Sequence, residues 1–168
     1  MIQAFKKMGD VFSDIKESIG NLIVWFPVIW KDRWWDHWFV YSMLHKKLSL
    51  MEQNIRHHGH HANAENDADK IKKCVLLLER LLKDEGYHEM AFKRHYEKWG
   101  EPQMAWKKME GSDLVKLEIT YPAVKNEEDK KQERKEFRIA MGMENRSRRQ
   151  DTDMLFDLMK KHIQTWWD

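Results

Sequence analysis

This 168-residue chain contains little cysteine, glycine or proline, and it has no long apolar run. Its one cysteine, Cys74, excludes an internal disulfide framework and any cysteine-rich zinc site. The seven glycines are scattered singly, so no glycine-rich loop is available to cradle a phosphate. The most apolar stretch, residues 22–30, contains Pro27 and is too short to span a bilayer as a helix.

A strong net charge is missing too. The 30 Lys and Arg residues nearly balance the 28 Asp and Glu residues, which leaves a formal charge of +2. Because this charge is close to zero, we expect no general nucleic-acid binding. Residues 1–20 lack the apolar core of a secretory signal peptide, so we expect a soluble cytoplasmic protein with no membrane partner.

Tryptophan, by contrast, is in large excess, with nine residues. Residues 32–41 read DRWWDHWFVY, and the stretch could form a core wall, a membrane anchor or a platform for a flat ligand. On a helix these rings spread over roughly 160°, at about 100° per residue, which one neighbouring helix cannot easily cover. Some of them are therefore expected to contact the N-terminal segment, another subunit or a ligand, since aromatic rings stack well on bases. The predicted ligand-binding residues of this stretch are Arg33, Trp34, Trp35, His37, Trp38 and Tyr41.

Apolar residues recur at steps of three or four from Ile2 to Ile19 and predict an amphipathic helix that ends at Gly20. This helix could dock on the rest of the fold, on another subunit or on a membrane surface. For residues 22–30 we expect a short buried segment, strand-like or irregular.

Two longer helices follow in the predicted order. The first starts between Asp32 and Asp36, one of which caps it, and runs to His58, where Gly59 supplies a left-handed residue. The second starts after the cap Asn63, follows a heptad alternation and stops at Gly86. The short loop between them predicts an antiparallel helical hairpin.

The remaining chain predicts a third helix that Gly100 ends, a connector over residues 101–113, and an alternating segment over residues 114–121. That segment is either a lone strand or an extended linker, because no partner strand is evident. A solvated charged helix and a C-terminal helix capped by Asp151 complete the chain, and the latter should dock on the hairpin. We therefore predict a mostly α-helical single domain with at most one short β element. Its segments are the N-terminal arm 1–31, the hairpin 32–85, a short helix and connector 86–125, and the two C-terminal helices 126–168.

The string HHGHH, residues 57–61, places four histidines around one glycine. It could chelate a transition metal, bind a phosphate or form a solvated turn near a helix C-terminus. We include His58, His60 and His61 among the predicted ligand-binding residues and assign no metal ligand and no cofactor.

No catalytic constellation is evident. The helical di-metal signature Glu-x-x-His occurs only at Glu85–His88, without a second copy. Cys74 is expected to be a buried, inert thiol, and His88 and His95 are expected at the surface. Arg146, Arg148 and Arg149 could hold phosphate, be solvated or pair with the acidic stretch 126–129. We assign no catalytic residue and expect no enzyme.

The strings WFPVIWKDRWWDHW, HYEKWGE and MLFDLMKKHIQTWWD, together with residues 44–85, resemble a family of small uncharacterised proteins encoded by tailed bacteriophages. The resemblance covers residues 25–168. It implies expression in the cytoplasm of an infected bacterium, and it implies no activity and no functional residue.

Small phage proteins without catalytic motifs often act by binding, and one class resembles sponges, which are oligomers that sequester nucleotide-derived signals of host immunity. The leading hypothesis is therefore a homo-oligomeric, non-enzymatic protein that sequesters such a signal. The alternatives are an interaction protein that grips a host or virion protein, and a metal-dependent hydrolase that uses His57–His61.

Overall fold

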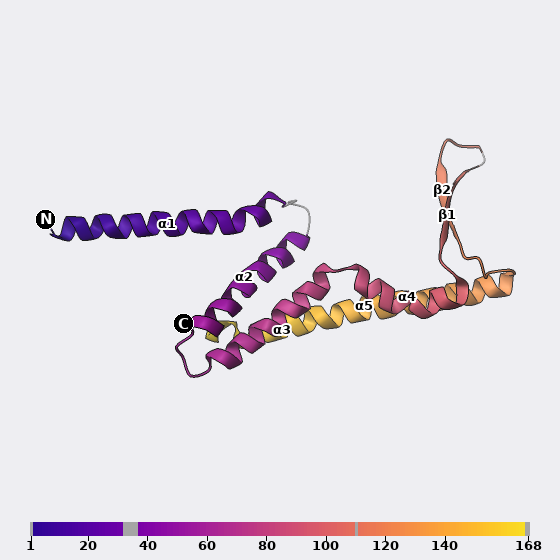
Figure 1. Cartoon of the computed structure of the whole chain (residues 1–168). Helices are drawn as coiled ribbons and strands as arrows, with labels where there is room; N and C mark the ends of the chain where they lie inside the picture. Colours follow the sequence, from indigo (N-terminus) through magenta and orange to yellow (C-terminus); the bar gives the residue numbers. More distant parts are fainter. Residues whose placement is uncertain (1, 32–36, 110, 167–168) are drawn as a thin grey trace. The chain divides into compact units, whose positions relative to one another are not determined.

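Most of the chain is helical, with one small sheet (Figure 1). The computed structural model describes residues 2–31, 37–109 and 111–166, with side chains from residue 14 onward. This composition of elements confirms the predicted mostly-α fold class. The chain divides into two units, residues 1–78 and residues 79 onward, with the boundary inside helix α3. The single domain expected from the sequence stays a prediction.

Helix α1 (Ile2–Trp30) runs without interruption through Gly20 and Pro27. The predicted stop at Gly20 is wrong, because one glycine costs only about 1 kcal/mol relative to alanine while the apolar periodicity continues beyond it. The prediction of a buried, non-helical segment at residues 22–30 is also wrong, since these residues are helical and Leu22 is 69% exposed. Among the described residues, no helix combines the length and apolar character that crossing a bilayer requires.

Helices α2 (His37–His58) and α3 (Ala64–Leu82) form the predicted helical hairpin, and the chain reverses direction between them (Figure 1). The predicted end at His58 is confirmed, whereas the predicted caps Asp32 and Asp36 lie outside the described residues. Gly59 is not left-handed as predicted. Glycine is required there for space, because a Cβ would clash with the carbonyl oxygen of Ile55 and lie 2.8 Å from the Cβ of Ala64.

The apolar face of the hairpin follows the predicted heptad pattern. Leu48 and Ile55 of α2 are buried. The buried residues on the predicted stripe of α3 are Ala68, Ile71, Cys74, Val75, Leu77, Leu78 and Leu81. Arg56 bridges Glu52 on its own helix and Asp69 on α3, at 2.6 and 2.9 Å, which links the two helices near the loop.

The second unit begins with the last turn of α3 and helix α4 (Glu85–Trp99). The predicted helix stop at Gly86 is wrong, because α3 already ends at Leu82 and Gly86 lies inside α4. The predicted end at Gly100 is confirmed. There φ is +82°, a conformation that favours glycine, and an added Cβ would meet the Cδ of Pro122 at 3.1 Å.

Strands β1 (Gln103–Lys108) and β2 (Val115–Thr120) pair antiparallel as a hairpin that stands away from the α4–α5 pair (Figure 1). The segment 114–121, expected to be a lone strand or an extended linker, therefore contains a paired strand, and the predicted connector at 101–113 is wrong because it contains the partner strand. Met104 lies opposite Ile119 and Trp106 opposite Leu117 on one face of the hairpin. That face is exposed to solvent, with Trp106 at 70%.

Helix α5 (Glu127–His162) is one continuous helix, followed by the 3₁₀ turn η1 (Ile163–Thr165), and it packs against α4. The two separate C-terminal helices predicted from the sequence were wrong, as was the cap at Asp151, which lies inside α5 and is buried. The actual cap is Asn126, whose side chain accepts a hydrogen bond from the backbone N–H of Asp129 at 2.8 Å.

Candidate ligand-binding groove

The aromatic residues predicted to bind a ligand are described only in part. Arg33, Trp34 and Trp35 lie outside the described residues. His37 and Trp38 lie in the first turn of α2, with ring centroids 6.4 Å apart, and Tyr41 follows one turn later, 6.0 Å from His37. These three rings remain together on one end of α2, while the rest of the predicted platform stays a prediction.

The histidines predicted for the same site lie at the other end of α2. His58 is the last residue of that helix, and His60 and His61 lie in the following loop. Because α2 has 22 residues, its ends are about 30 Å apart at 1.5 Å per residue. The structure therefore places the predicted residues in two groups, and one small ligand cannot touch both.

The loop that contains His60 and His61 contacts α3 through the carboxylate of Asp67. The Nε2 of His61 lies 3.4 Å from the carboxylate of Asp67, and the Nζ of Lys70 lies 2.8 Å from the same group. Burial alone would raise the pKa of Asp67, but the bonds from Lys70 and His61 hold this pKa below its ordinary value. Across the described ranges, no group of three or more His, Cys, Asp and Glu side chains is arranged to hold a metal ion.

Cys74 fits the expectation of an inert thiol. Its side chain is fully buried in α3, and this burial raises the pKa of the thiol to about 11. The group is therefore protonated at neutral pH, whereas cysteine nucleophiles act as thiolates.

A groove of about 590 Å³ lies between α4 and α5, entirely within the second unit. Such a volume is within the range of small-molecule sites, roughly 300–1,000 Å³. From α4 the spacing of four residues brings Met90, Arg94 and Lys98 to the groove, because residues i and i+4 share a helix face. Apolar side chains from α5 complete the lining, namely Ile139, Ala140 and Met143.

The groove is bordered by positive charge. Lys93, Arg94 and Lys98 line it, and within the described part of the chain Lys93 and Arg94 make no ion pair. A neighbouring hollow of about 430 Å³ shares Ile139 with the groove. Its other lining residues are Lys131, Arg134, Lys135 and Arg138 of α5. Seven cations therefore line the two hollows of a nearly neutral chain. Lys98 is paired with Glu136, and the field of the other six attracts anions.

One buried polar atom in the groove lining lacks a hydrogen-bond partner. His95 is only 4% exposed, and its Nε2 lies 3.2 Å from the carboxylate of Glu133. Its Nδ1 has no partner among the described residues. If Nε2 donates to Glu133, Nδ1 is left as an acceptor, and a buried group without a partner costs about 1–3 kcal/mol. The sequence prediction that His95 lies at the surface is wrong, because its ring packs against Phe92, Tyr121 and Phe137.

Glu136 fixes one wall of the groove. Its carboxylate accepts hydrogen bonds from Lys98 at 2.6 Å, Gln132 at 2.7 Å and the indole N–H of Trp99 at 2.7 Å. These bonds, led by the one from Lys98, lower the pKa of Glu136 to about 2. The ammonium group of Lys98 is thereby held beside the groove, 4.6 Å above the Trp99 ring.

We expect acid to lower the free energy of unfolding of the second unit, because it protonates Glu136. In the unfolded chain this carboxyl titrates near 4.5, but in the folded chain its pKa is about 2. The stabilisation is therefore complete above pH 4.5 and is lost as the pH falls toward 2. Urea unfolding at pH 3 and pH 6 measures the effect, and Glu136→Gln should show a smaller difference between the two. Identical pH dependence in both proteins would contradict this assignment.

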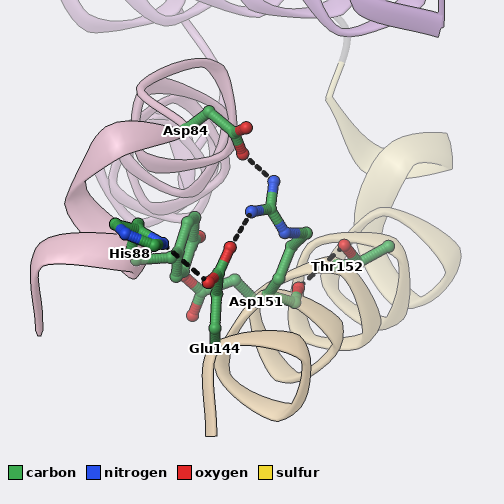
Figure 2. Close-up of polar contacts among 7 residues, drawn as sticks. Asp84, His88, Glu144, Asp151 and Thr152 are labelled. Carbon is green, nitrogen blue, oxygen red and sulfur yellow. Dashed lines mark hydrogen bonds and ion pairs between the residues drawn. The ribbon is translucent and has the colours of Figure 1, made fainter. Parts of the chain in front are cut away.

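A set of polar contacts joins α4 to α5 at a different position along the pair, and Figure 2 shows it. Arg148 of α5 forms ion pairs with Asp84 and, at 3.0 Å, with Glu144, which also lies 3.2 Å from the Nδ1 of His88. The Nε2 of His88 lies 2.7 Å from the hydroxyl of Tyr96. These contacts link the same two helices that form the walls of the groove.

Sequence reasoning missed the residues of this groove, although part of the signal was present. Arg94 and Lys98 repeat at a spacing of four, and Lys131, Arg134, Lys135 and Arg138 repeat at three and four. The sequence did not indicate that these two segments face each other. Two of the three arginines singled out instead are paired with acids, Arg148 as described and Arg149 with Asp153 at 3.8 Å.

Known proteins supply no assignment for this surface. No family model, no curated protein and no solved structure matches the chain.

Proposed function

We propose that this chain is a non-enzymatic binding protein that holds a nucleotide-like small molecule in the groove between α4 and α5. The observation that carries the proposal is the combination of unpaired cations and apolar side chains around one groove of about 590 Å³. Nucleotides present the matching chemistry, because they join an anionic phosphate to a flat, largely apolar base.

Each part of the groove has a role in this proposal. Arg94 and Lys93 bind phosphate oxygens, and the guanidinium of Arg94 offers two parallel donors. Met90, Ile139 and Met143 contact the base or the sugar, since methionine side chains adapt to flat surfaces.

The biological part of the proposal rests on the resemblance to tailed-phage proteins. A binding protein made inside an infected bacterium would act by sequestering a nucleotide-derived signal of host defence. Such a protein works in the host cytoplasm at a copy number comparable with the amount of the signal. This role needs affinity and abundance, and it needs no reaction.

Calorimetry against a panel of cyclic dinucleotides and cyclic ADP-ribose isomers tests the proposal. We expect at least one member to bind at micromolar or better affinity. Arg94→Glu should weaken this binding by about 10- to 100-fold, because a charged hydrogen bond contributes about 1.5–3 kcal/mol.

Arg149→Glu is the matched control, since it makes the same charge change on an exposed side chain outside the groove. It should leave the affinity within about threefold of the original. Absence of binding across the panel would overturn the proposal, and so would equal losses in both variants. A loss in Trp38→Ala but not in Arg94→Glu would place the ligand at the start of α2 instead.

A second function, gripping a host or virion protein, is favoured by the β-hairpin. Met104, Trp106, Leu117 and Ile119 form an apolar face that is exposed to solvent. A two-stranded hairpin is marginally stable alone in water, so a protein that covers this face would also stabilise it. Replacing Trp106 and Leu117 by serine should abolish retention of a stoichiometric partner from infected cells. Serine replacements at Lys107 and Lys116, on the opposite face, should leave this retention unchanged.

A further inference from the structure

Besides the β-hairpin face, helix α1 carries an exposed apolar stripe. The spacing of this stripe is that of a coiled coil. From Phe5 to Ile29, apolar residues recur at alternating steps of three and four. The series is Phe5, Met8, Phe12, Ile15, Ile19, Leu22, Phe26 and Ile29. These eight residues occupy the a and d positions of consecutive heptads, and an apolar a/d repeat of three to four heptads is typical of a coiled coil.

The described part of this stripe is exposed. Ile15, Ile19, Leu22, Phe26 and Ile29 are each between 49 and 69% exposed. Five large apolar side chains on one face would be costly in water, since burial of each contributes about 1.5–3 kcal/mol. The stripe therefore requires a cover that its own unit does not provide.

The helix also needs a partner in order to be helical. It contains Gly20 and Pro27, and proline in a helix interior costs about 3 kcal/mol. Helix in proteins is stabilised mainly by packing of an apolar face. Both Gly20 and Pro27 fall on the b position of the heptad, away from the a/d stripe, so neither interrupts the packing surface.

The charges of α1 indicate which partner fits. The helix carries three basic and three acidic residues, so its net charge is zero. They are Lys6, Lys7, Asp10, Asp14, Lys16 and Glu17. Helices that lie on anionic membranes are usually rich in Lys and Arg, which this helix is not. A helix with balanced charges and a regular a/d stripe is complementary to itself.

We infer that the cover is a second copy of this chain, and that copies associate through α1 in a coiled coil along residues 5–29. Association brings Ile15, Ile19 and Phe26 of one copy against the same stripe of another. The groove between α4 and α5 takes no part in this contact, so the inference stands independently of the proposed function.

Sedimentation equilibrium of the full chain tests the inference. The expected result is a mass at a multiple of 20.5 kDa at micromolar concentration. Ile19→Asp places a charge on the stripe and should return the protein to the monomer mass. Asn21→Asp introduces the same side chain two residues later, at a c position away from the stripe, and should leave the mass unchanged.

Urea unfolding of both variants shows whether the second unit stays folded, and neither substitution should change it. A monomeric wild-type chain overturns the inference. An Ile19→Asp variant that associates as strongly as the wild type also overturns it. Co-flotation of the wild-type chain with phosphatidylcholine vesicles, combined with a monomer mass in their absence, assigns the stripe to a lipid surface and equally overturns it.

Discussion

Phe92→Ala should lower the free energy of unfolding of the second unit by about 3–5 kcal/mol, the range measured for large aromatic truncations in protein cores. Phe92 is 1% exposed and lies at the centre of an aromatic cluster between α4 and α5. Its ring stacks on His88 at 4.3 Å and meets Phe137 edge-on at 5.2 Å. Truncation removes these contacts and leaves a cavity that the two long helices cannot close without shifting.

Denaturant unfolding followed by circular dichroism measures this loss. The slope of the transition shows whether the surface exposed on unfolding has changed. Met90→Ala is the control, because Met90 lies two residues earlier on α4 and is 66% exposed. It should change the free energy by no more than about 0.5 kcal/mol. Similar losses in the two variants would mean that the packing of α4 does not depend on the Phe92 cluster.

The second large effect is expected at Asp151, a buried carboxylate in the middle of α5. It accepts a hydrogen bond of 2.5 Å from the hydroxyl of Tyr87, which is 3% exposed, and lies 3.0 Å from the guanidinium of Arg80. Asp151→Ala removes the charged acceptor and leaves the tyrosine hydroxyl buried without this partner. Losing a charged hydrogen bond costs about 1.5–3 kcal/mol. We therefore expect a loss of about 3 kcal/mol.

Asp153→Ala provides the matched control, because that carboxylate is exposed and its only described ion pair is the 3.8 Å contact with Arg149. Exposed pairs of this kind contribute between zero and about 1 kcal/mol. A double-mutant cycle with Tyr87→Phe isolates the Tyr87–Asp151 bond and should give a coupling well above 0.5 kcal/mol. Additive losses would show that the bond contributes little and that the cost arises elsewhere.

The sequence predicted the helices wherever an apolar stripe was regular. The stripe of α3 was read correctly, because Ile71, Val75 and Leu78 repeat at steps that only a helix brings to one face. The helix ends predicted at glycine were less accurate. Gly20 and Gly86 lie inside helices, because neighbouring turns supply enough stabilisation to outweigh the local cost of one glycine.

Two other errors have the same physical origin, which is that contacts distant in sequence decided the outcome. Residues 103–108 show no clear alternation, yet they pair with β2 because the loop that contains Gly111 turns the chain back. Asp151 has the chemistry of a helix cap, but the hydroxyl of Tyr87, 64 residues away, gives it a partner in the middle of α5. The groove was beyond prediction for this reason, since its walls come from residues 90–98 and 136–143.

The burial of the single cysteine also makes the chain useful for kinetic measurements. Cys74 is fully buried, and its pKa is raised to about 11, so a thiol reagent reaches it only after α3 opens. With excess reagent, the rate of labelling therefore reports the opening rate of that helix. Labelling of Cys74 is detected as one mass increment on the intact protein. The wild-type chain thus measures the local opening of α3 without any introduced probe, and a cysteine introduced at the surface would react separately from Cys74.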